Sequence, residues 1–544
     1  MSNQQEDVTH PYALNQQVVY NRIGIEIAEQ DIPENSRIIK NRIEREWTDY
    51  CHHVDPHGTF PLQMTSQKVY NFMFYQLFRS KNSGTSRALT NFNGRDYDRV
   101  LAEYSIHLEN YTRHGIPIPH PPEGLGKSSL HQYRAYLRKI HASHVAENLT
   151  SLPFELVFTE RCKKLIKTGE MRKTKQDREN YKEKVDKVFG PYHAVEKMDD
   201  VEDKMWSRSK KIKGSGSWLR NRFIFLYTTA GILRSESLFR AELSDFLFIK
   251  VKKPEDIHSL LLMITQIPEG MSDLPTQHLD ETKISQFTPA LGKTNHGRKI
   301  YGRATRHKDV RYCAIGALSF YLTYRFFITD EFSSPNFPWT NNSSWFDVKL
   351  LVTPQIPIEN SSATDYTKPM KTNTYARSIK HVLGDLGIVV THFAHLGRQL
   401  GAKILEMLEV ESEEIRRLGN WNPSMQDSCY STKLPMKPIH RLAGFTTSGG
   451  MYYNPRTAVT VPTSLQQATP IGRWVFNAMN QVKTMNSNGG QLYTAQNFLE
   501  FLTELNIVFL QDMATMMIEH PSRLTNHKGF EQLHILRSND FMVR

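Results

Sequence analysis

The sequence predicts a mostly helical protein of several domains, with one small β-sheet in its central part. Three observations support this fold class. The length of 544 residues corresponds to about three or four folded units at roughly 100–200 residues each. A composition of 39% hydrophobic and 23% charged residues can bury real cores, which argues against extensive disorder. Apolar residues recur mostly at helical spacing, while short strand-type patterns occur within residues 246–264.

Several protein classes are disfavoured at this level. The longest apolar run, Phe223 to Leu233, is too short to cross a bilayer, and the N-terminus carries no secretory signal. Four scattered cysteines without CxxC or zinc spacing exclude a disulfide scaffold and a zinc finger. The common nucleotide-loop, zinc-protease and hydrolase signatures are missing from the sequence. We therefore expect a soluble intracellular protein without membrane contact, metal or cofactor.

The N-terminal half reads as helical. Residues 1–60 are polar with a helical patch from Ile38 to Tyr50, which predicts an arm or a small cap. Residues 61–200 form the next predicted domain, with helices at Val69–Phe78 and Leu130–Ile140. The proline cluster at 116–122 divides this domain into two helical pairs, because proline interrupts a helix.

A second domain is predicted over residues 218–455. It combines long apolar helices with two short strands, and a loop-rich stretch covers residues 332–372. The predicted helices are Phe223–Leu233, Tyr312–Phe327 and those between Thr374 and Arg417; the predicted strands are Phe246–Lys252 and Leu260–Ile264.

The remaining residues, 456–544, are predicted to form a helical tail. Amphipathic helices are expected from Trp474 to Val482 and from Ala495 to Glu519. The second contains Met513, Met516 and Met517, a composition typical of a core helix and also compatible with docking of a partner or a second copy.

Basic residues concentrate between the two predicted domains. Residues 161–220 contain 18 Lys+Arg and 10 Asp+Glu, a local excess of +8 out of the total +12. This stretch ends in Gly-Ser-Gly-Ser before Trp218, so residues 201–217 are interpreted as a basic linker. A solvated helical face is the ordinary alternative. Counterion release from phosphates makes such a linker suitable for holding a DNA duplex. The predicted DNA contacts here are Arg172, Lys173, Lys175, Arg208, Lys210, Lys211 and Lys213.

Four segments of the second domain carry groups suited to a phosphodiester. They are Gly231–Asp245, residues 292–318, Thr391–Arg398 and Leu418–Tyr430. Two guanidinium groups can neutralise the non-bridging oxygens of a pentavalent phosphate. A lysine could protonate the leaving sugar oxygen, and a phenol could act as nucleophile if nearby cations favour its anion. Paired carboxylates are missing from these segments, which disfavours a two-metal nuclease.

The order of these groups resembles the catalytic domain of tyrosine recombinases, the phage-integrase class. The resemblance makes Arg234 the first arginine, Lys293 the hairpin lysine, and His395 and Arg398 the His-x-x-Arg pair. Trp421 lies 23 residues beyond Arg398, and Tyr430, the nucleophile position, follows nine residues later. Lys299 and Lys308 remain alternatives for the lysine, and each residue taken singly could be an ordinary packing or surface group.

More narrowly, residues 215–455 resemble the Crypton-related fungal branch of this class. The likeness rests on Arg234-Ser-Glu, Arg306-His-Lys-Asp, and Trp421-Asn with the following Tyr430. That branch includes domain two of the large DNA-binding subunit of the yeast centromere-binding complex. Arg306 and His307 are then phosphate contacts or turn residues, and Arg377 starts a helix near DNA. One departure is the 161 residues between Arg234 and His395, which imply insertions relative to compact recombinases.

The resemblance implies a recombinase-like, two-domain DNA clamp with a helical extension, and three functions remain open. The preferred one is a nuclear platform that clamps duplex DNA through its phosphates at the centromere, for assembly of a kinetochore with other proteins. The second is an active Crypton-type recombinase that forms a phosphotyrosyl intermediate through Tyr430. The third is a fungal transcription regulator on the same fold. A homodimer would suit pairing of two sites.

Overall fold

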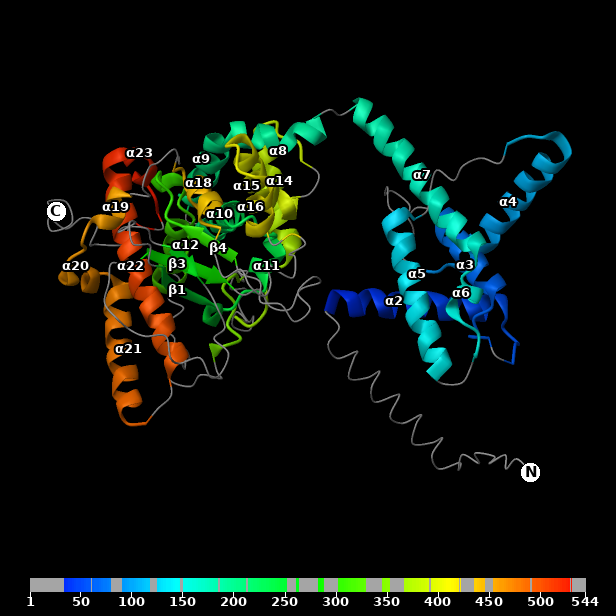
Figure 1. Cartoon of the computed structure of the whole chain (residues 1–544), viewed down its shortest axis with the longest axis horizontal. Helices are drawn as coiled ribbons and strands as arrows, with labels where there is room; N and C mark the ends of the chain where they lie inside the picture. The colour runs from blue at the N-terminus through cyan, green and yellow to red at the C-terminus, as the bar shows by residue number, and fades with distance from the viewer. Residues whose placement is uncertain are drawn as a thin grey trace, which may run out of the picture. The chain divides into compact units, whose positions relative to one another are not determined.

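The computed structural model forms two compact units, Met1–Lys184 and Val185–Arg544, which are described separately (Figure 1). The structure describes residues 34–59, 61–79, 91–117, 125–146, 150–183, 186–211, 214–251, 261–263, 282–287, 302–328, 345–352, 366–390, 393–419, 421, 435–445, 454–489, 492–528 and 530. Most of these residues are helical, as the apolar spacing predicts.

Unit 1 is built from helices around one aromatic-rich core. Its helices are α2 (Glu34–Val54), α3 (Ser66–Phe78), α4 (Gly94–His114), α5 (Lys127–Ala146), α6 (Phe154–Val157) and α7 (Glu160–Glu183). Trp47 and Tyr50 of α2 are buried against Phe72 of α3. The prediction of an arm or cap over residues 1–60 is therefore wrong for α2, because this helix supplies part of the core of unit 1.

A buried carboxylate joins three helices of unit 1. Glu46 of α2 accepts hydrogen bonds from Tyr133 of α5 at 2.7 Å and from Arg79, which follows α3, at 3.0 Å. All three side chains are almost fully buried. Because the arginine and the hydroxyl group satisfy this buried charge, the network holds α2, α3 and α5 in one arrangement.

Unit 2 contains the remaining helices and a small sheet. Its helical elements are α8 (Asp186–Glu196), α9 (Met198–Ser209), α10 (Ser215–Ala230), α11 (Ser235–Phe239), η1 (Leu243–Asp245), η2 (Val310–Tyr312), α12 (Ala314–Thr323), η3 (Tyr324–Ile328), α14 (Thr372–Asp385), η4 (Phe393–His395), α15 (Leu396–Met407), α16 (Ser412–Leu418), α18 (Met436–Leu442), α19 (Pro455–Ala458), α20 (Thr463–Ala468), α21 (Pro470–Ser487), α22 (Tyr493–Glu519) and α23 (Pro521–Leu524).

The sheet of unit 2 has four strands in the order β1-β3-β4-β2, and all the paired strands are antiparallel. The strands are β1 (Phe246–Val251), β2 (Leu261–Met263), β3 (Thr282–Phe287) and β4 (Gly302–Thr305). In the register, Phe246 is opposite Phe287, and Leu261 is opposite Thr305. β1 and β2 correspond to the two strands that the sequence predicts.

Helices α10, α12 and α22 form the centre of unit 2 (Figure 1). Phe223 of α10 stacks on Tyr321 of α12, and Phe320 of α12 meets Phe509 of α22 edge-on at 5.3 Å. Helix α22 is long and apolar enough to cross a bilayer by length and composition, yet most of its apolar stretch is buried in this core. Residues 456–528 therefore do not form a separate tail, although their helices lie where the sequence predicts them.

The predicted linker over residues 201–217 is also corrected. Most of it lies in α9 and at the start of α10, and the boundary between the units falls at residues 184 and 185. Trp206 is buried and donates its indole N–H to the carbonyl oxygen of Arg523 at 2.8 Å. Basic residues near the surface of a packed helix produce the same local composition as a linker, and the burial of Val201, Met205 and Trp206 distinguishes the two.

Candidate functional site

The site begins with the close packing of α15 on α10. Side chains are absent at Gly397 and Gly401, where a Cβ atom would overlap Thr228 Oγ1 and the carbonyl oxygen of Thr229, respectively. Two glycines four residues apart lie on one face of a helix, so they let the two backbones approach closely. This contact brings the start of α15, which carries Arg398, against the C-terminal end of α10.

A strained turn then places Arg234 at the same point. Helix α10 ends at Ala230, and Ile232 has a φ of 50°, in the left-handed region that β-branched residues rarely adopt. The Leu233 N–H donates to the carbonyl oxygen of Thr228 at 2.9 Å, which closes the turn. Ile232 is fully buried among residues of α15, α16 and α18, and this burial offsets the strain. Arg234 follows directly as the N-cap of α11.

Arg398 is half-buried and held by two contacts. Its Nη2 donates to the carbonyl oxygen of Gly419 at 2.8 Å, and its guanidinium group lies 5.0 Å from the centroid of the Trp421 ring. Burial, and secondarily the nearby charge of Arg234, lower the pKa of Arg398 to about 10. The ring and the carbonyl therefore fix the plane of a guanidinium group whose charged form is disfavoured by its surroundings.

Neither arginine is paired with a carboxylate in the part of the chain that the structure describes. The Arg234 Nε is buried without a hydrogen-bond partner. Two guanidinium groups that repel one another and lack a counter-ion create a position where an anion is stabilised. The geometry suits a group with several negative oxygens, such as a phosphate.

His395 lies next to this pair. It is half-buried at the end of η4, immediately before α15, and η4 contacts both α11 and α14. The structure thus brings together Arg234, His395, Arg398 and Trp421, which the sequence places up to 187 residues apart. Lys293 and Tyr430 lie outside the described residues, so their roles stay predictions.

Arg306 is not a phosphate contact, and this prediction is wrong. Its side chain is fully buried, donates to Gln511 at 2.9 Å and forms an ion pair with Asp512 of α22. His307 serves the turn: its Nδ1 accepts the Asp309 N–H at 2.9 Å, and its carbonyl accepts from Arg456 at 2.7 Å. Burial lowers the pKa of His307 to about 4, which keeps the ring neutral near pH 7.

Two of the predicted linker contacts bind protein groups instead. Arg208 forms an ion pair with Asp385 at 2.6 Å and stacks on Trp218, while Lys210 donates to the carbonyl oxygens of Ser522 and Thr525. Lys211 is exposed. Lys213 and the side chains of Arg172, Lys173 and Lys175 lie outside the described residues.

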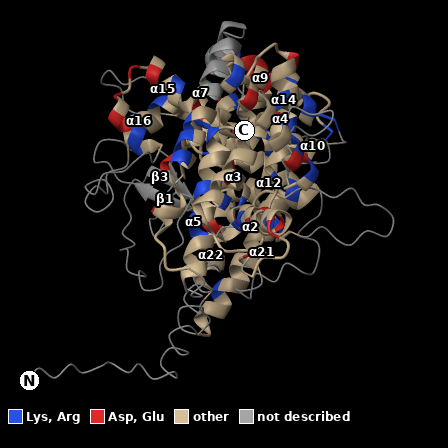
Figure 2. Ribbon diagram, turned by 90° about the vertical axis from the view of Figure 1, so that its right-hand side faces the viewer, with Lys and Arg blue, Asp and Glu red and all other residues tan. Residues whose placement is uncertain are grey.

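Other cations are exposed on single faces of helices. Arg377 lies on the exposed face of α14 together with Lys380, opposite the buried Tyr375 and Ile379. In unit 1, α7 exposes Arg161, Lys164 and Lys167. In the sequence these three residues belong to the basic stretch of residues 161–220, which is not assigned to a helix face. Their three-residue spacing indicates that they share one face of a helix. Figure 2 shows basic residues interspersed with acidic ones on α15 and α16.

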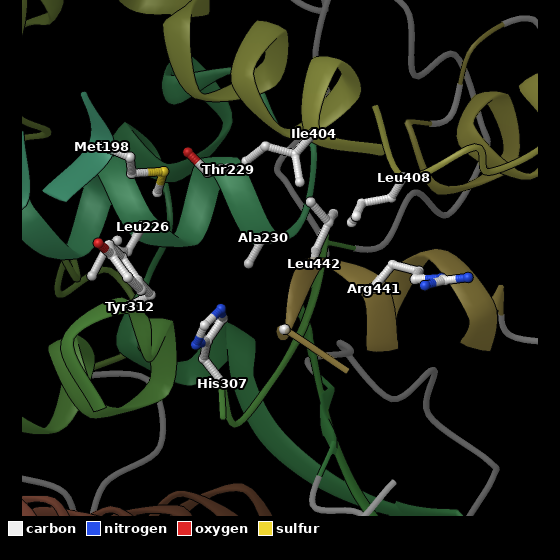
Figure 3. Close-up of a pocket in the computed structure, with 11 residues that line it drawn as sticks. Met198, Leu226, Thr229, Ala230, His307, Tyr312, Ile404, Leu408, Arg441 and Leu442 are labelled. Carbon is white, nitrogen blue, oxygen red and sulfur yellow. The ribbon is translucent and has the colours of Figure 1, made fainter. Parts of the chain in front are cut away.

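A cavity of 310 Å³ lies at the other end of α15 (Figure 3). Its wall is mostly apolar, formed by side chains such as Leu226, Ile404 and Leu442, and its polar residues are Thr229, His307, Tyr312 and Arg441. The Nδ1 atom of His307 accepts the Asp309 N–H, so this nitrogen is not free to act as a general base toward the cavity. In the described part of the chain, no group of three or more His, Cys, Asp or Glu is placed to hold a metal ion.

Comparison with known proteins identifies the family. No curated protein matches the sequence significantly. Residues 160–541 match the family model described as centromere DNA-binding protein complex CBF3 subunit, domain 2. This match begins at α7, includes every described element of unit 2, and covers well over half of the chain. It therefore shows that the chain belongs to the family of centromere DNA-binding protein complex CBF3 subunits defined by domain 2.

Proposed function

We propose that this chain is a DNA-binding platform that holds duplex DNA mainly through its phosphate backbone, at a centromere and within a complex of several proteins. The single observation that carries the proposal is the Arg234–Arg398 pair, two neighbouring guanidinium groups without a carboxylate partner in the described part of the chain. Membership of the CBF3 subunit family supports DNA and the centromere as the target and the nucleus as the location.

A DNA phosphate relieves the unfavourable electrostatics of this pair. The phosphate charge offsets the repulsion between the guanidinium groups, and each group can donate two hydrogen bonds to its oxygens. Because Arg398 is partly buried, these bonds form in a medium of lower dielectric than water and are correspondingly strong. Trp421 and the Gly419 carbonyl hold the Arg398 plane before DNA arrives, so little side-chain entropy is lost on binding.

Other exposed cations in each unit would add sequence-independent affinity. Arg377 and Lys380 lie on α14, which contacts the segment that carries His395. The α7 cations Arg161, Lys164 and Lys167 give unit 1 a phosphate-binding face of its own. We extend the proposal to a recombinase-like clamp in which both units contact the same duplex, with backbone contacts positioning the protein.

The test compares DNA affinity against salt for the wild type and the double variant Arg234→Gln/Arg398→Gln. The wild type should show log K falling linearly with log[salt], and each lost phosphate contact should reduce the slope by about 0.9. We expect the double variant to bind at least about tenfold more weakly, on centromeric and unrelated duplexes alike. Arg208→Gln is the matched control, because Arg208 is already paired with Asp385. A flat salt dependence, or equal loss in the control, contradicts the proposal.

An active recombinase is the second candidate, favoured by the clustering of Arg234, His395, Arg398 and Trp421 in recombinase order. In that reaction the Tyr430 oxygen attacks phosphorus, and the leaving 5′ sugar oxygen takes a proton from a general acid. Nicked suicide duplexes incubated with wild type and Tyr430→Phe distinguish the two functions. An SDS-resistant adduct that the variant lacks establishes the recombinase. Tight, salt-sensitive binding by both proteins without an adduct leaves the platform as the function.

A further inference from the structure

The 310 Å³ cavity of unit 2 takes its walls from five segments of the chain: α9, α10, residues 307–312, α15 and the end of α18. Ala230, the last residue of α10, lies between the other lining side chains (Figure 3). Gly444 follows α18 with a φ of 82°, and a Cβ atom there would lie 3.1 Å from His307 Nε2. Two small residues therefore leave open a space that larger side chains would fill.

The lining of this cavity is apolar for the most part and carries one charge. Leu226, Ile404 and Leu442 supply hydrocarbon surface. His307 is neutral near pH 7, because burial lowers its pKa to about 4. Arg441 is thus the one charged group among the described lining residues. An apolar wall with a few polar groups that fix orientation is typical of pockets for small organic molecules.

Arg441 has no anion of its own in the part of the chain that the structure describes. It lies half-buried in the last turn of α18, and its Nε is buried without a hydrogen-bond partner. A cation in the last turn offsets the helix dipole, yet this effect leaves the guanidinium N–H donors unsatisfied. Figure 3 shows the side chain extending beneath Leu408 and away from His307. The charged group therefore lies at one end of the apolar lining.

The charges next to the cavity favour an anion. Lys308 donates its backbone N–H to the carbonyl oxygen of Ala443 at 2.8 Å, so this exposed lysine lies beside the end of α18. The following residue, Asp309, is already paired with Arg311, whose Nη2 lies 2.7 Å from Oδ2. The unpaired charge of these described residues is therefore positive, which disfavours a cationic ligand.

We propose that this cavity binds a small organic carboxylate, an acid whose aliphatic or aromatic body fills the apolar lining. The body supplies the dispersion contacts that Leu226, Ile404 and Leu442 lack toward the empty space. The carboxylate accepts hydrogen bonds from the planar fork of the Arg441 guanidinium group. An acid of about twelve non-hydrogen atoms should bind with a dissociation constant on the order of 0.1–1 mM. None of these residues belongs to the Arg234–Arg398 pair, so the site can be tested without DNA.

Saturation-transfer difference NMR on the full chain measures the binding of 4-phenylbutyrate, titrated to about 5 mM. Two matched probes separate the parts of this ligand. 4-Phenylbutyramide keeps the body and removes the charge, whereas butyrate keeps the charge and lacks the ring. We expect 4-phenylbutyrate to bind at least about fivefold more tightly than either probe, because only it uses both the apolar lining and Arg441.

Three variants locate the binding. Ala230→Leu should weaken both aromatic probes at least about tenfold and keep or raise the melting temperature, because the added side chain occupies empty apolar space. Arg441→Gln should weaken 4-phenylbutyrate at least about fivefold and change the amide by less than about twofold. Arg473→Gln is the matched control, since this arginine is exposed on α21 outside the lining. It should change the affinity for either probe by less than about twofold.

Loss of both aromatic probes in Ala230→Leu, with loss of the carboxylate preference in Arg441→Gln, supports the site. Wild-type protein without saturable binding of 4-phenylbutyrate overturns the proposal. Binding that survives in a folded Ala230→Leu overturns it too, and so does an amide that binds the wild type as tightly as the carboxylate. If thermal melts show that Ala230→Leu does not fold, the two arginine variants decide, and equal effects of Arg441→Gln and Arg473→Gln refute the assignment.

Discussion

Two groups of arginines in unit 2 show opposite electrostatics. Arg306 and Arg456 surround one carboxylate, that of Asp512, which is fully buried in α22. Arg234 and Arg398 lie together without a carboxylate partner among the described residues, and burial, followed by the nearby charge of Arg234, lowers the pKa of Arg398. The first group has its counter-ion within the protein. The second has no counter-ion among the described residues and can be neutralised by an anion from outside the protein.

The difference separates structural from functional arginines better than sequence position does. Arg306, Arg234 and Arg398 all lie in segments that resemble recombinase motifs, and the sequence alone leaves Arg306 as either a phosphate contact or a turn residue. A buried charge with its counter-ion stabilises a particular packing only when the pair is complete. A partly buried charge without one lowers stability slightly and increases affinity for a ligand. Four variants test this contrast, from the largest expected effect to the smallest.

Removing the carboxylate of the first group should have the largest effect. Asp512→Asn removes the buried carboxylate that Arg306 and Arg456 share, and should lower the free energy of unfolding by about 3–5 kcal/mol. Urea denaturation followed by circular dichroism measures the loss. The control is Glu406→Gln, which breaks an exposed pair with Lys403 and should cost at most about 0.5 kcal/mol. Equal losses in the two variants would show that the Asp512 group is not a critical core charge.

Arg398→Gln should not lower the free energy of unfolding, in contrast to Asp512→Asn. A lowered pKa means that folding disfavours the charged guanidinium, so stability without DNA should stay unchanged or rise by on the order of 1 kcal/mol, after allowance for solvent screening. Because the folded chain releases the Arg398 proton at a lower pH than the unfolded chain, the free energy of unfolding of the wild type should increase as the pH rises through about 10. Pyrophosphate should raise the melting temperature of the wild type more than that of the variant. A large loss of stability in Arg398→Gln would make Arg398 a structural residue like Arg306.

The pH dependence of stability tests whether His307, which lies beside Arg456, is buried and neutral. Its carbonyl oxygen accepts from Arg456, and burial lowers its pKa to about 4. The unfolded chain takes up a proton near the ordinary histidine pKa of about 6.5, whereas the folded chain does not. Its contribution is therefore present above that value and is lost as the pH falls to about 4. His307→Gln should flatten the stability curve between these pH values in thermal melts, and an unchanged slope would refute the assignment.

Arg208→Gln should have the smallest effect. The Arg208–Asp385 pair is partly exposed, with side-chain exposures of 28% and 40%, so its loss should cost about 0.2–1 kcal/mol. The salt dependence of DNA binding should not change, because this arginine already has its anion. Lys211→Gln, which removes an exposed neighbouring cation, is the comparison for binding. If Arg208→Gln reduces the salt slope and Lys211→Gln does not, the predicted linker contact with DNA is restored.

Local patterns in the sequence determined the secondary structure well. The apolar spacing at Val69–Phe78, Tyr312–Phe327 and Ala495–Glu519 predicts α3, α12 with η3, and α22 to within a few residues. These helices bury one face or their whole surface, so the spacing of their apolar residues follows the faces that are buried. The order and spacing of Arg234, His395, Arg398 and Trp421 likewise indicated residues that lie near one another in the fold. These residue types can be recognised in the sequence because each has a side-chain group suited to binding phosphate.

Only the tertiary structure decided which charges are free. Arg306 meets Asp512 across 206 residues, and Lys210 meets the carbonyl of Thr525 across 315, so no local window contains either partner. The same long-range packing makes α22 part of the core of unit 2 and places α2 in that of unit 1. A run of basic residues in the sequence gives only the number of cations. Burial and carboxylates from distant segments determine which of these cations remain available to DNA.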